Sequence, residues 1–443
     1  MAADLLQIGA SGLRAAQAQL DVTSQNIANA STAGYVRRSV TQTELVGVST
    51  SSTYGAISQW GVRVSGIARN VDSLSQSEVR RTGSDAARAD TLVAGLTSVS
   101  DAVDTSGVYS AITGFQSALS KLTSSPTDSS LRANVLSAAG TMAQSFNTAR
   151  TALASAQSNF QLAATDGVSQ VNTLATSLAR LNLSIAGNTD PASQAGLLDQ
   201  RDGLLQQLSQ LGDMTTTIAA NGTVNVQMGG ASGPMLVTGS TASTMSMSQD
   251  STGAISYKLD STALTLSGGS LAGTQQAMAA SISAGASLDG IANSLMTTVN
   301  DAQANGAALD GTSGQPMFSG TGAAGIALAL TSGSQIAAAA SGSAANSGDQ
   351  TNLKALISSM GSVDIASQTN TLLYNLSSAV ASNTTTRDTL DTIHSNAQAN
   401  VASQSDVNLD DEAANLVRYQ QAYQASAKVI SVAQTLFDQL LQL

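Results

Sequence analysis

Residues 416–441 read LVRYQQAYQASAKVISVAQTLFDQLL, a stretch with large apolar side chains at a fixed interval in a chain otherwise rich in small residues. Five large residues lie seven positions apart: Leu409, Leu416, Tyr423, Ile430 and Phe437. A second row lies four positions after each of them and holds Ala413, Gln420, Ala427, Gln434 and Leu441. This heptad interval predicts a helix with an apolar stripe. Asn408 is a suitable N-cap for it, because its side chain can accept a hydrogen bond from the first turn.

The other end of the chain carries a matching stripe. Four large residues again lie seven positions apart: Leu6, Leu13, Leu20 and Ile27. The small residues Gly9, Ala16 and Thr23 fill the row between them. We expect this helix to end within NIANASTAGYVRR (26–38), where Asn29 and Gly34 are turn formers and Gly34 can take a positive φ.

Neither terminal helix is expected to be stable alone. Helix nucleation is unfavourable, and even good sequences of this length are marginal in water. Gly9 and Gly12 each cost roughly 1 kcal/mol relative to alanine. The large residues return about 1.5–3 kcal/mol each, but only when they are buried against something. Each terminal helix therefore needs a partner.

The composition indicates how the rest of the chain packs. Its 443 residues are 42% hydrophobic but only 3% aromatic, so most apolar side chains are small. Small side chains bury little area, and burial is worth about 25 cal/mol per Å². We therefore expect two to four domains, with elongated packing of helix on helix rather than one thick globular core.

Between its ends the chain changes pattern. It reads as helical from about Asp72 to Leu211, and GLLDQRDGLLQQLSQLGDM (196–214) is the clearest internal helix. Short alternating runs with Asn-Gly and Gly-Gly then predict strands and hairpins near residues 214–270. Helices return over Ala277–Asn305 and Asn352–Gln398, with a Gly-rich, weakly patterned stretch between them.

The predicted fold is mainly α with an inserted β module, in an elongated multidomain chain. The expected division is residues 1–60 and 401–443 as the two halves of a terminal coiled-coil domain, 61–212 and 273–400 as a helical bundle domain, and 213–272 as the inserted β domain. Such nesting predicts that both termini lie at one pole of the molecule and the insertion at the other.

Charge and residue usage argue against several function classes. Lys and Arg total 18 against 29 Asp and Glu, and no basic block interleaves with aromatics, so we expect no nucleic-acid partner. Cysteine is absent, which excludes disulfides, a thiolate metal site and a thiol nucleophile. Runs such as GIALAL (325–330) are too short to span a bilayer, so we expect no membrane insertion. Residues 1–17 lack a basic segment followed by an apolar core, so no cleavable secretory signal is expected.

Candidate chemical groups are few. The single histidine, His394, has no cysteine or base beside it, and we expect a packing or solvated role. LDGTSGQPMFSG (309–320) lacks the acidic spacing of a Ca²⁺ loop and predicts a structural turn. GTGAAG (320–325) does not follow a convincing strand, so it does not indicate a nucleotide site.

Charged side chains give no catalytic pattern either. Asp199 and Asp202 flank Arg201 in LDQRDG, and we expect a local ion pair or a cap rather than an acid–base pair. Arg37 and Arg38 are expected to form a solvated edge. We therefore predict no enzyme activity, no cofactor and no metal.

Several motifs resemble those of flagellar axial proteins. SQNIANASTAGYVRR (24–38) resembles the N-terminal motif of rod, hook and hook-associated proteins, whose marker residues here are Asn26, Asn29, Gly34 and Tyr35. The tail VNLDDEAANLVRYQQAYQASAKVISVAQTLFDQLL (407–441) resembles most specifically the hook-associated members at the junction between hook and filament. LLDQRD (197–202) and LDGTSGQPMF (309–318) agree with this resemblance, whereas the β region is smaller than in longer members.

The resemblance implies an extracellular structural protein of the bacterial flagellum, exported unfolded through the flagellar type III apparatus with a chaperone. It implies self-assembly into a junction layer, with the hook protein and the second junction protein as neighbours. The terminal helices would pair as an inner coiled coil, the helical domain would surround them, and the β domain would face outward. The assembly interface would comprise Leu6, Leu13, Leu20, Ile27, Leu409, Leu416, Tyr423, Ile430, Phe437 and Leu441.

Three other interpretations stay open. The chain could be another axial component, such as a hook protein or a third-position junction protein. It could be a cytoplasmic signalling coiled coil, although that interpretation needs heptads sustained through the middle, where the predicted strands interrupt them. An enzyme with a Ser or Asp nucleophile is the third, and sparse ionisable groups disfavour it.

Overall fold

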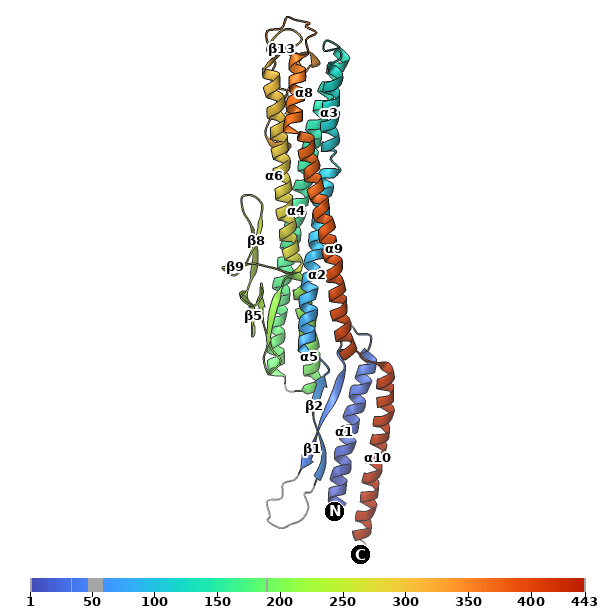
Figure 1. The fold of residues 1–443 in the computed structure, drawn as a ribbon. Coiled ribbons are helices and arrows are strands. Elements are labelled where there is room, and N and C mark those ends of the chain that lie inside the picture. The colour runs from blue at the N-terminus through green and yellow to red at the C-terminus, as the bar shows by residue number, and fades with distance from the viewer. Residues whose placement is uncertain (1, 33, 47–58, 189, 442–443) are drawn as a thin grey trace.

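Long helices run along the molecule and form its body (Figure 1). The computed structural model describes residues 2–32, 34–46, 59–188 and 190–441. Helix α4 (Ser129–Gly187) has 59 residues, which at 1.5 Å per residue makes it about 90 Å long. The other helices of the body are α2 (Ser73–Asp104), α3 (Val108–Leu122), α5 (Pro191–Leu211), α6 (Gly269–Ala304), α8 (Thr351–Val363) and α9 (Ile365–Ser405).

Aspartate residues lie at the start of several of these helices and at the boundary between α8 and α9. The side chain of Asp72 accepts a hydrogen bond from the amide of Leu74 at the start of α2, and that of Asp128 accepts one from the amide of Leu131 at the start of α4. These bonds satisfy donors that the first turn of a helix leaves unpaired. Asp364, with a φ of 49°, separates α8 from α9 and caps the latter.

Small residues allow the long helices to pack closely. A Cβ added to Gly95 of α2 would collide with the side chain of Ala277 of α6, and one on Gly273 would lie 2.5 Å from the carbonyl oxygen of Arg88. The backbones of α2 and α6 can approach this closely only because glycine and alanine lie at the crossing. The Ala- and Gly-rich composition is therefore used for helix-on-helix contact, as the sequence predicts.

The body contains two apolar clusters. One lies between α3, α4, α6 and α8, where Phe115, Phe146 and Phe318 are fully buried and Phe115 meets Phe318 edge to face at 6.2 Å between ring centroids. The other lies where α4 and α6 meet the β module, and there the hydroxyl of Tyr257 donates to the carbonyl of Leu271. These two clusters hold the helical body and the inserted strands together.

The inserted β module forms two antiparallel sheets. The first has the order β3-β4-β5-β6 and the second the order β7-β8-β9. Their strands are β3 (Met214–Ile218), β4 (Val224–Met228), β5 (Met235–Thr238), β6 (Thr241–Ala242), β7 (Met245–Gln249), β8 (Ile255–Leu259) and β9 (Thr262–Leu264). The prediction of short strands and hairpins in this part of the chain is confirmed.

The predicted position of the β module at the pole opposite the termini is wrong. The module lies against the flank of α4, part-way along the body, and α3, α8 and β13 occupy the far pole (Figure 1). The alternating strands explain this position, because Val224, Val226 and Met228 are buried in one cluster with α4. Asn182 of α4 also donates to the carbonyls of Val224 and Gly239. An apolar sheet face is thus covered by a helix, which places the sheet alongside the bundle.

The Gly-rich stretch between α6 and α8 forms short elements at the far pole. They are β10 (Gly306–Ala307), β11 (Phe318–Ser319), α7 (Gly322–Gly325), β12 (Ala327–Leu328), the 3-10 helix η1 (Gly333–Gln335) and β13 (Ala339–Ala340). Arg132 of α4 is buried beneath them and donates to the carbonyls of Gly333 and Ile336. Together with Asn147 and Asn300, which also donate to carbonyls of this stretch, Arg132 holds a segment that has little periodic pattern of its own.

The two ends of the chain form a separate unit below the body (Figure 1). Helix α1 (Ala2–Asn29) lies antiparallel to α10 (Leu409–Leu441), with both termini at the same pole. A hairpin of β1 (Arg38–Val46) and β2 (Gln59–Arg69) packs against α1. Sequence reasoning did not predict this hairpin, and the domain boundary proposed at residue 60 falls within β2. The division into domains stays a proposal.

Candidate functional site

The seam between α1 and α10 is made by small residues. A Cβ on Gly9 would lie 2.8 Å from Cγ1 of Ile430, and one on Gly12 would lie 3.0 Å from Oγ of Ser426. Ala433 of α10 is buried in the same seam. The row predicted to hold small residues on α1 therefore faces its partner helix, and the two backbones lie close together.

The predicted large residues are only partly buried by this seam, and Ile430 is the one that lies against Gly9. On α1, Leu6, Leu13, Leu20 and Ile27 are all half-buried. On α10, Leu416 and Ile430 are half-buried, whereas Leu409, Tyr423 and Phe437 are 53%, 37% and 46% exposed. Leu441 is the last residue of α10, and its side chain lies outside the described part of the chain. The role of these ten residues in an assembly interface stays a prediction.

A second apolar row runs along α10 and was missed by sequence reasoning. Val417, Val429, Val432 and Leu436 are all exposed. The last three follow each other at intervals of three and four residues, which is the spacing of one helix face. This spacing is present in the sequence, but the prediction was based on the heptad row, whose side chains are larger. Helix α10 thus presents apolar side chains on two sides.

Asn26 connects the elements of the terminal unit at the end next to the body, where Arg38 and Arg69 pair with α5 and form the joint between the two units. It is 1% exposed. Its Nδ2 donates to the carbonyl of Arg38 at 2.9 Å and to Oε2 of Glu412 at 3.2 Å. Its Oδ1 accepts from the hydroxyl of Tyr35 at 2.9 Å and from the amide of Arg38 at 3.0 Å. One asparagine therefore connects α1, the start of β1 and the first turn of α10.

The other marker residues of the N-terminal motif shape the turn after α1. Asn29 donates to the carbonyl of Gln25 and ends the helix. Gly34 has a φ of 78°, a conformation that favours glycine. The guanidinium of Arg38 lies 4.9 Å from the centre of the Tyr35 ring. This turn carries the chain back so that Tyr35 reaches Asn26.

The prediction that Arg37 and Arg38 form a solvated edge is wrong. Nε of Arg37 lies 2.7 Å from Oε1 of Glu412, whose side chain is buried. Nη2 of Arg38 lies 2.8 Å from Oδ2 of Asp199 in α5. Both arginines pair with carboxylates that lie far away in the sequence, so no local pattern indicated their partners. Asn408 caps α10 as predicted, since its Oδ1 accepts from the amide of Asp410 at 3.0 Å.

The LDQRDG segment of α5 binds the base of the hairpin. Arg69 donates to Asp199 at 2.8 Å and to Asp202 at 2.7 Å. Arg201 pairs with Asp202 at 2.6 Å, so the expected local ion pair is present. Arg201 also donates to the carbonyl of Gly222 next to the β module. The motif thus joins α5, the β1–β2 hairpin and the β module. The sequence did not indicate these long-range contacts.

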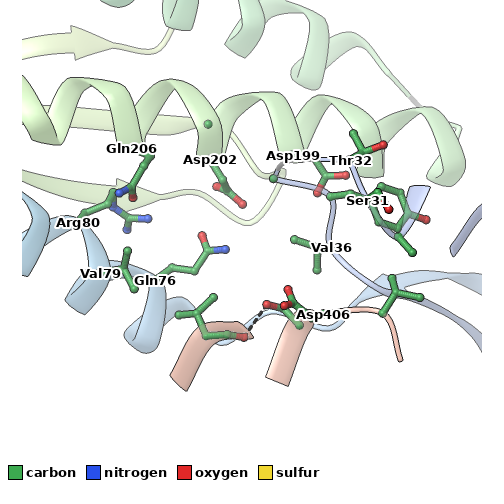
Figure 2. Close-up of a pocket in the computed structure, with 17 residues that line it drawn as sticks. Ser31, Thr32, Val36, Gln76, Val79, Arg80, Asp199, Asp202, Gln206 and Asp406 are labelled. Atoms are coloured by element: carbon green, nitrogen blue, oxygen red, sulfur yellow. Dashed lines mark hydrogen bonds between the residues drawn. The ribbon is translucent and has the colours of Figure 1, made fainter. Parts of the chain in front are cut away.

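A cavity of about 510 Å³ lies at this joint, between the end of α1, α2, α5 and the link from α9 to α10 (Figure 2). Burial raises the pKa of Tyr35, which lines it, and nearby Arg38 opposes part of that rise. Burial lowers the pKa of Arg80 on α2, and the Asp202 carboxylate counteracts this. The cavity therefore combines partly dehydrated charged and polar groups at the point where the two units meet.

Other candidate groups from the sequence have packing roles. His394 of α9 contacts Thr82 of α2 at 3.0 Å through Nδ1 and lies against Gly83. In the 309–320 segment, Asp310 accepts from the amide and hydroxyl of Thr312, which forms the expected turn. Within the described ranges, no group of three or more His, Asp or Glu side chains could hold a metal ion. Among helices of the described residues, none has the length and apolarity needed to cross a bilayer.

Families of flagellar proteins match most of the chain. A family model described as flagellar hook-associated protein FlgK helical domain matches residues 96–318. Models of a flagella basal body rod protein and of the flagellar basal body rod FlgEFG protein C-terminal region match residues 6–35 and 398–443. The matches at the two ends coincide with α1 and its turn, and with α10.

Individual relatives agree with these families. Flagellar hook-associated protein 1 of Salmonella typhimurium (strain LT2) is 31% identical over 54% of this chain and 43% of its own length, so the chain spans less than half of that relative. Flagellar hook-associated protein 1 of Bacillus subtilis (strain 168) is 26% identical, with 98% of this chain and 97% of that protein covered. The flagellar hook junction protein FlgK from Burkholderia pseudomallei shares the fold, with a TM-score of 0.50 and 24% identity over 55% of this chain and 46% of that chain.

Proposed function

Because the chain belongs to the flagellar hook-associated protein FlgK family, we propose that it is a structural component of the bacterial flagellum. In this proposal copies of the chain assemble through their terminal helices into the layer that joins hook to filament. The relatives named hook-associated protein 1 and the neighbour titled hook junction protein support this position. The family is one of structural flagellar proteins, so the proposal includes no catalysis.

The observation that carries the proposal is the apolar surface left on the terminal helix pair. Leu409, Tyr423 and Phe437 of the heptad row are exposed. Val429 and Leu436 of the second apolar row are also exposed. Fully burying side chains of this size is worth about 1.5–3 kcal/mol each. Contact with the same helices in adjacent copies would bury both rows and stabilise the layer.

The partners and location follow from the same proposal. Adjacent axial subunits, which are the hook protein on one side and the second junction protein on the other, would continue the contacts above and below the layer. An export chaperone would hold the chain before the type III apparatus passes it to the exterior. The terminal helices would lie innermost as a coiled coil, with the helical body around them and the β module facing outward.

A second candidate is another axial component of the flagellum. The rod-protein models that match residues 6–35 and 398–443 describe ends shared by axial proteins in general. These ends therefore do not distinguish a junction protein from a hook protein, and the match over residues 96–318 favours the junction.

Immuno-electron microscopy of intact cells tests the location. An epitope inserted in the exposed turn between β7 and β8, at residues 251–252, leaves both terminal helices unchanged. We expect label in one narrow band between hook and filament. Label along the whole hook or along the filament would contradict the junction role and support the second candidate.

An aspartate substitution tests the role of the terminal pair. Ile430→Asp places a charge in the seam against Gly9, and we expect at least a tenfold loss of the band of label with an unchanged helical body. Gln424→Asp adds the same charge to an exposed polar position of α10 and serves as the control, which should assemble normally. Equal assembly of the two variants would refute a role for this seam.

A further inference from the structure

Arg80 is a largely buried cation whose guanidinium opens onto the joint cavity and has no hydrogen bond to a described residue. Its side chain is on α2, and the residue is only 8% exposed. No hydrogen bond or ion pair joins its guanidinium to any described residue, although Asp202 lies near enough to influence its charge. Figure 2 shows it reaching into the joint cavity beside Gln206 of α5. Each guanidinium nitrogen keeps some exposed area in the cavity, so the group is open to a ligand that enters there.

The neighbouring carboxylates are already engaged. Arg37 pairs with Glu412, Arg38 and Arg69 share Asp199, and Arg69 and Arg201 share Asp202. Among the described residues of the joint there are therefore five guanidinium groups and three carboxylates, all three of which are paired. Arg80 is the guanidinium that has no ion pair. A fourth carboxylate, Asp406, is on the rim of the cavity and exposed. The cationic excess is local, because the whole chain has a net charge of −11.

We propose that the joint cavity is a receptor site in which Arg80 binds a carboxylate side chain presented by a neighbouring copy of this chain. The inference rests on the proposed function, since it names a contact between adjacent copies in the layer. A carboxylate in the cavity would accept charge-assisted hydrogen bonds from the fork of Arg80 donors. Gln76 and Gln206, which line the same cavity, offer amide groups for the rest of the guest segment.

A second copy is the occupant that the structure favours. With 29 acidic residues in the chain, every copy carries exposed carboxylates. Asp410 and Asp411, in the exposed first turn of α10, follow the cavity-lining residue Val407 by three and four positions. The cavity itself is bounded by the end of α1 and by Val407 just before α10, so it is continuous with the helix pair proposed to assemble. At about 510 Å³ it is large enough for a chain segment rather than for one small anion.

Photo-cross-linking in the assembled layer tests this contact. A benzophenone amino acid replaces Gln206, which lines the cavity, in full-length chains that carry two different tags and are co-produced in flagellated cells. We expect a two-chain product that carries both tags, with the cross-linked peptide containing Asp or Glu. The same photo-reactive residue at Gln207, exposed on the same helix and outside the cavity lining, should give at least fivefold less product.

Substitution of the cation completes the test. Arg80→Gln should lower the yield of the two-tag product at least fivefold, whereas Arg81→Gln, which removes an exposed neighbouring arginine, should leave it unchanged. Because no hydrogen bond or ion pair joins the Arg80 guanidinium to a described residue, the melting temperature of purified Arg80→Gln chain should be close to that of the original. A lower melting temperature would assign Arg80 a purely structural role and overturn the proposal.

The remaining outcomes are distinguishable. A two-tag product that persists in Arg80→Gln, or a cross-link only to a different protein, would overturn the proposal while the junction role stands. If sodium acetate raises the melting temperature of the chain but no two-tag product forms, the cavity binds a small anion only, and the inter-copy contact is refuted. If epitope label is absent from the junction, the proposed function fails, and the two-tag product still decides whether copies meet at this cavity.

Discussion

The helical body and the terminal helix pair use the same small residues but differ in how completely they bury them. In the body, α4 is surrounded by other helices and by the β module, and Phe146 and Leu153 are fully buried. In the terminal pair, α10 has one partner helix, and among its described side chains only Glu412 and Ala433 are buried. The difference lies in the number of neighbours that the chain itself supplies.

This comparison shows how one chain can combine a self-sufficient domain with an incomplete one. A surrounded helix buries its apolar side chains on folding, and that burial offsets the entropy lost by ordering the chain. A helix packed on one side recovers only part of that free energy, so it opens locally at low cost. The exposed rows of α10 are then available to other molecules. An assembly that supplies the missing neighbours would complete the terminal unit.

The largest expected effect is a contrast in amide hydrogen exchange within the dilute single chain. We expect amides of α10 to exchange on the order of 10³-fold faster than those around Phe146 in α4, because the body opens only by unfolding while the pair opens locally. Mass spectrometry of exchanged peptides measures both regions in one sample. Exchange in α10 should slow when the chain is part of the assembled layer. Equal protection of the two regions in the free chain would refute the comparison.

Much of the fold was predictable from local patterns. The heptad rows predicted both terminal helices, and Asn408 was identified as the N-cap of α10 from residue type and position. Alternating residues with Asn-Gly and Gly-Gly predicted the β module. The β1–β2 hairpin was missed because residues 47–58 separate its strands, so no short turn signal marks it, and because the β1 sequence RSVTQTELV is mostly polar.

The joint was only partly predictable. The marker residues Asn26, Gly34 and Tyr35 were singled out from the motif, but their contacts were not. Arg37 and Glu412 lie 375 residues apart, and Arg38 and Asp199 lie 161 apart. The periodicity of a helix or strand indicates which of its faces is buried. It does not indicate which distant charged residue contacts that face. A single sequence therefore indicated that the turn matters but not that it holds the two units together.

A substitution of Asn26 should loosen the terminal unit without affecting the body. Asn26→Ala removes four hydrogen bonds and leaves the Glu412 carboxylate with one donor fewer in a buried site. We expect the free energy of local opening of the terminal unit to fall by about 2–3 kcal/mol. Since about 1.4 kcal/mol is a tenfold change, exchange of α10 amides should accelerate on the order of 30- to 100-fold. Amides around Phe146 should be unchanged.

Asn29→Ala is the matched control for this substitution. Asn29 lies one turn further along α1, donates to the carbonyl of Gln25 and accepts from the hydroxyl of Thr32, so its side-chain bonds are local. We expect the free energy of local opening to change by less than about 1 kcal/mol, because these hydrogen bonds are exposed and local. If the two alanine variants accelerate exchange equally, Asn26 is an ordinary helix residue and its hydrogen bonds do not control the terminal unit.

The smallest expected effect separates the two units by pH. Burial raises the pKa of Tyr35, so the folded joint holds the phenol proton more tightly than the unfolded chain does. The stability that this provides is complete below the ordinary tyrosine pKa of about 10 and is lost as pH rises through the raised value. At about pH 8, Tyr35→Phe should lower the free energy of unfolding of the terminal unit by roughly 1 kcal/mol, because the hydrogen bond to Asn26 is lost. At about pH 11 the difference should shrink, because only the tyrosine form has a proton to lose.

Urea unfolding followed by circular dichroism at both pH values measures this difference in the transition that precedes unfolding of the body. Tyr374→Phe provides the control, because Tyr374 is 70% exposed on α9 and belongs to the body. Its substitution should leave the early transition unchanged at either pH. A Tyr35→Phe difference that stays constant or grows with pH would mean that Tyr35 is held by packing alone. The terminal unit would then be held by its ion pairs and by the other hydrogen bonds of Asn26, without a contribution from the phenol proton.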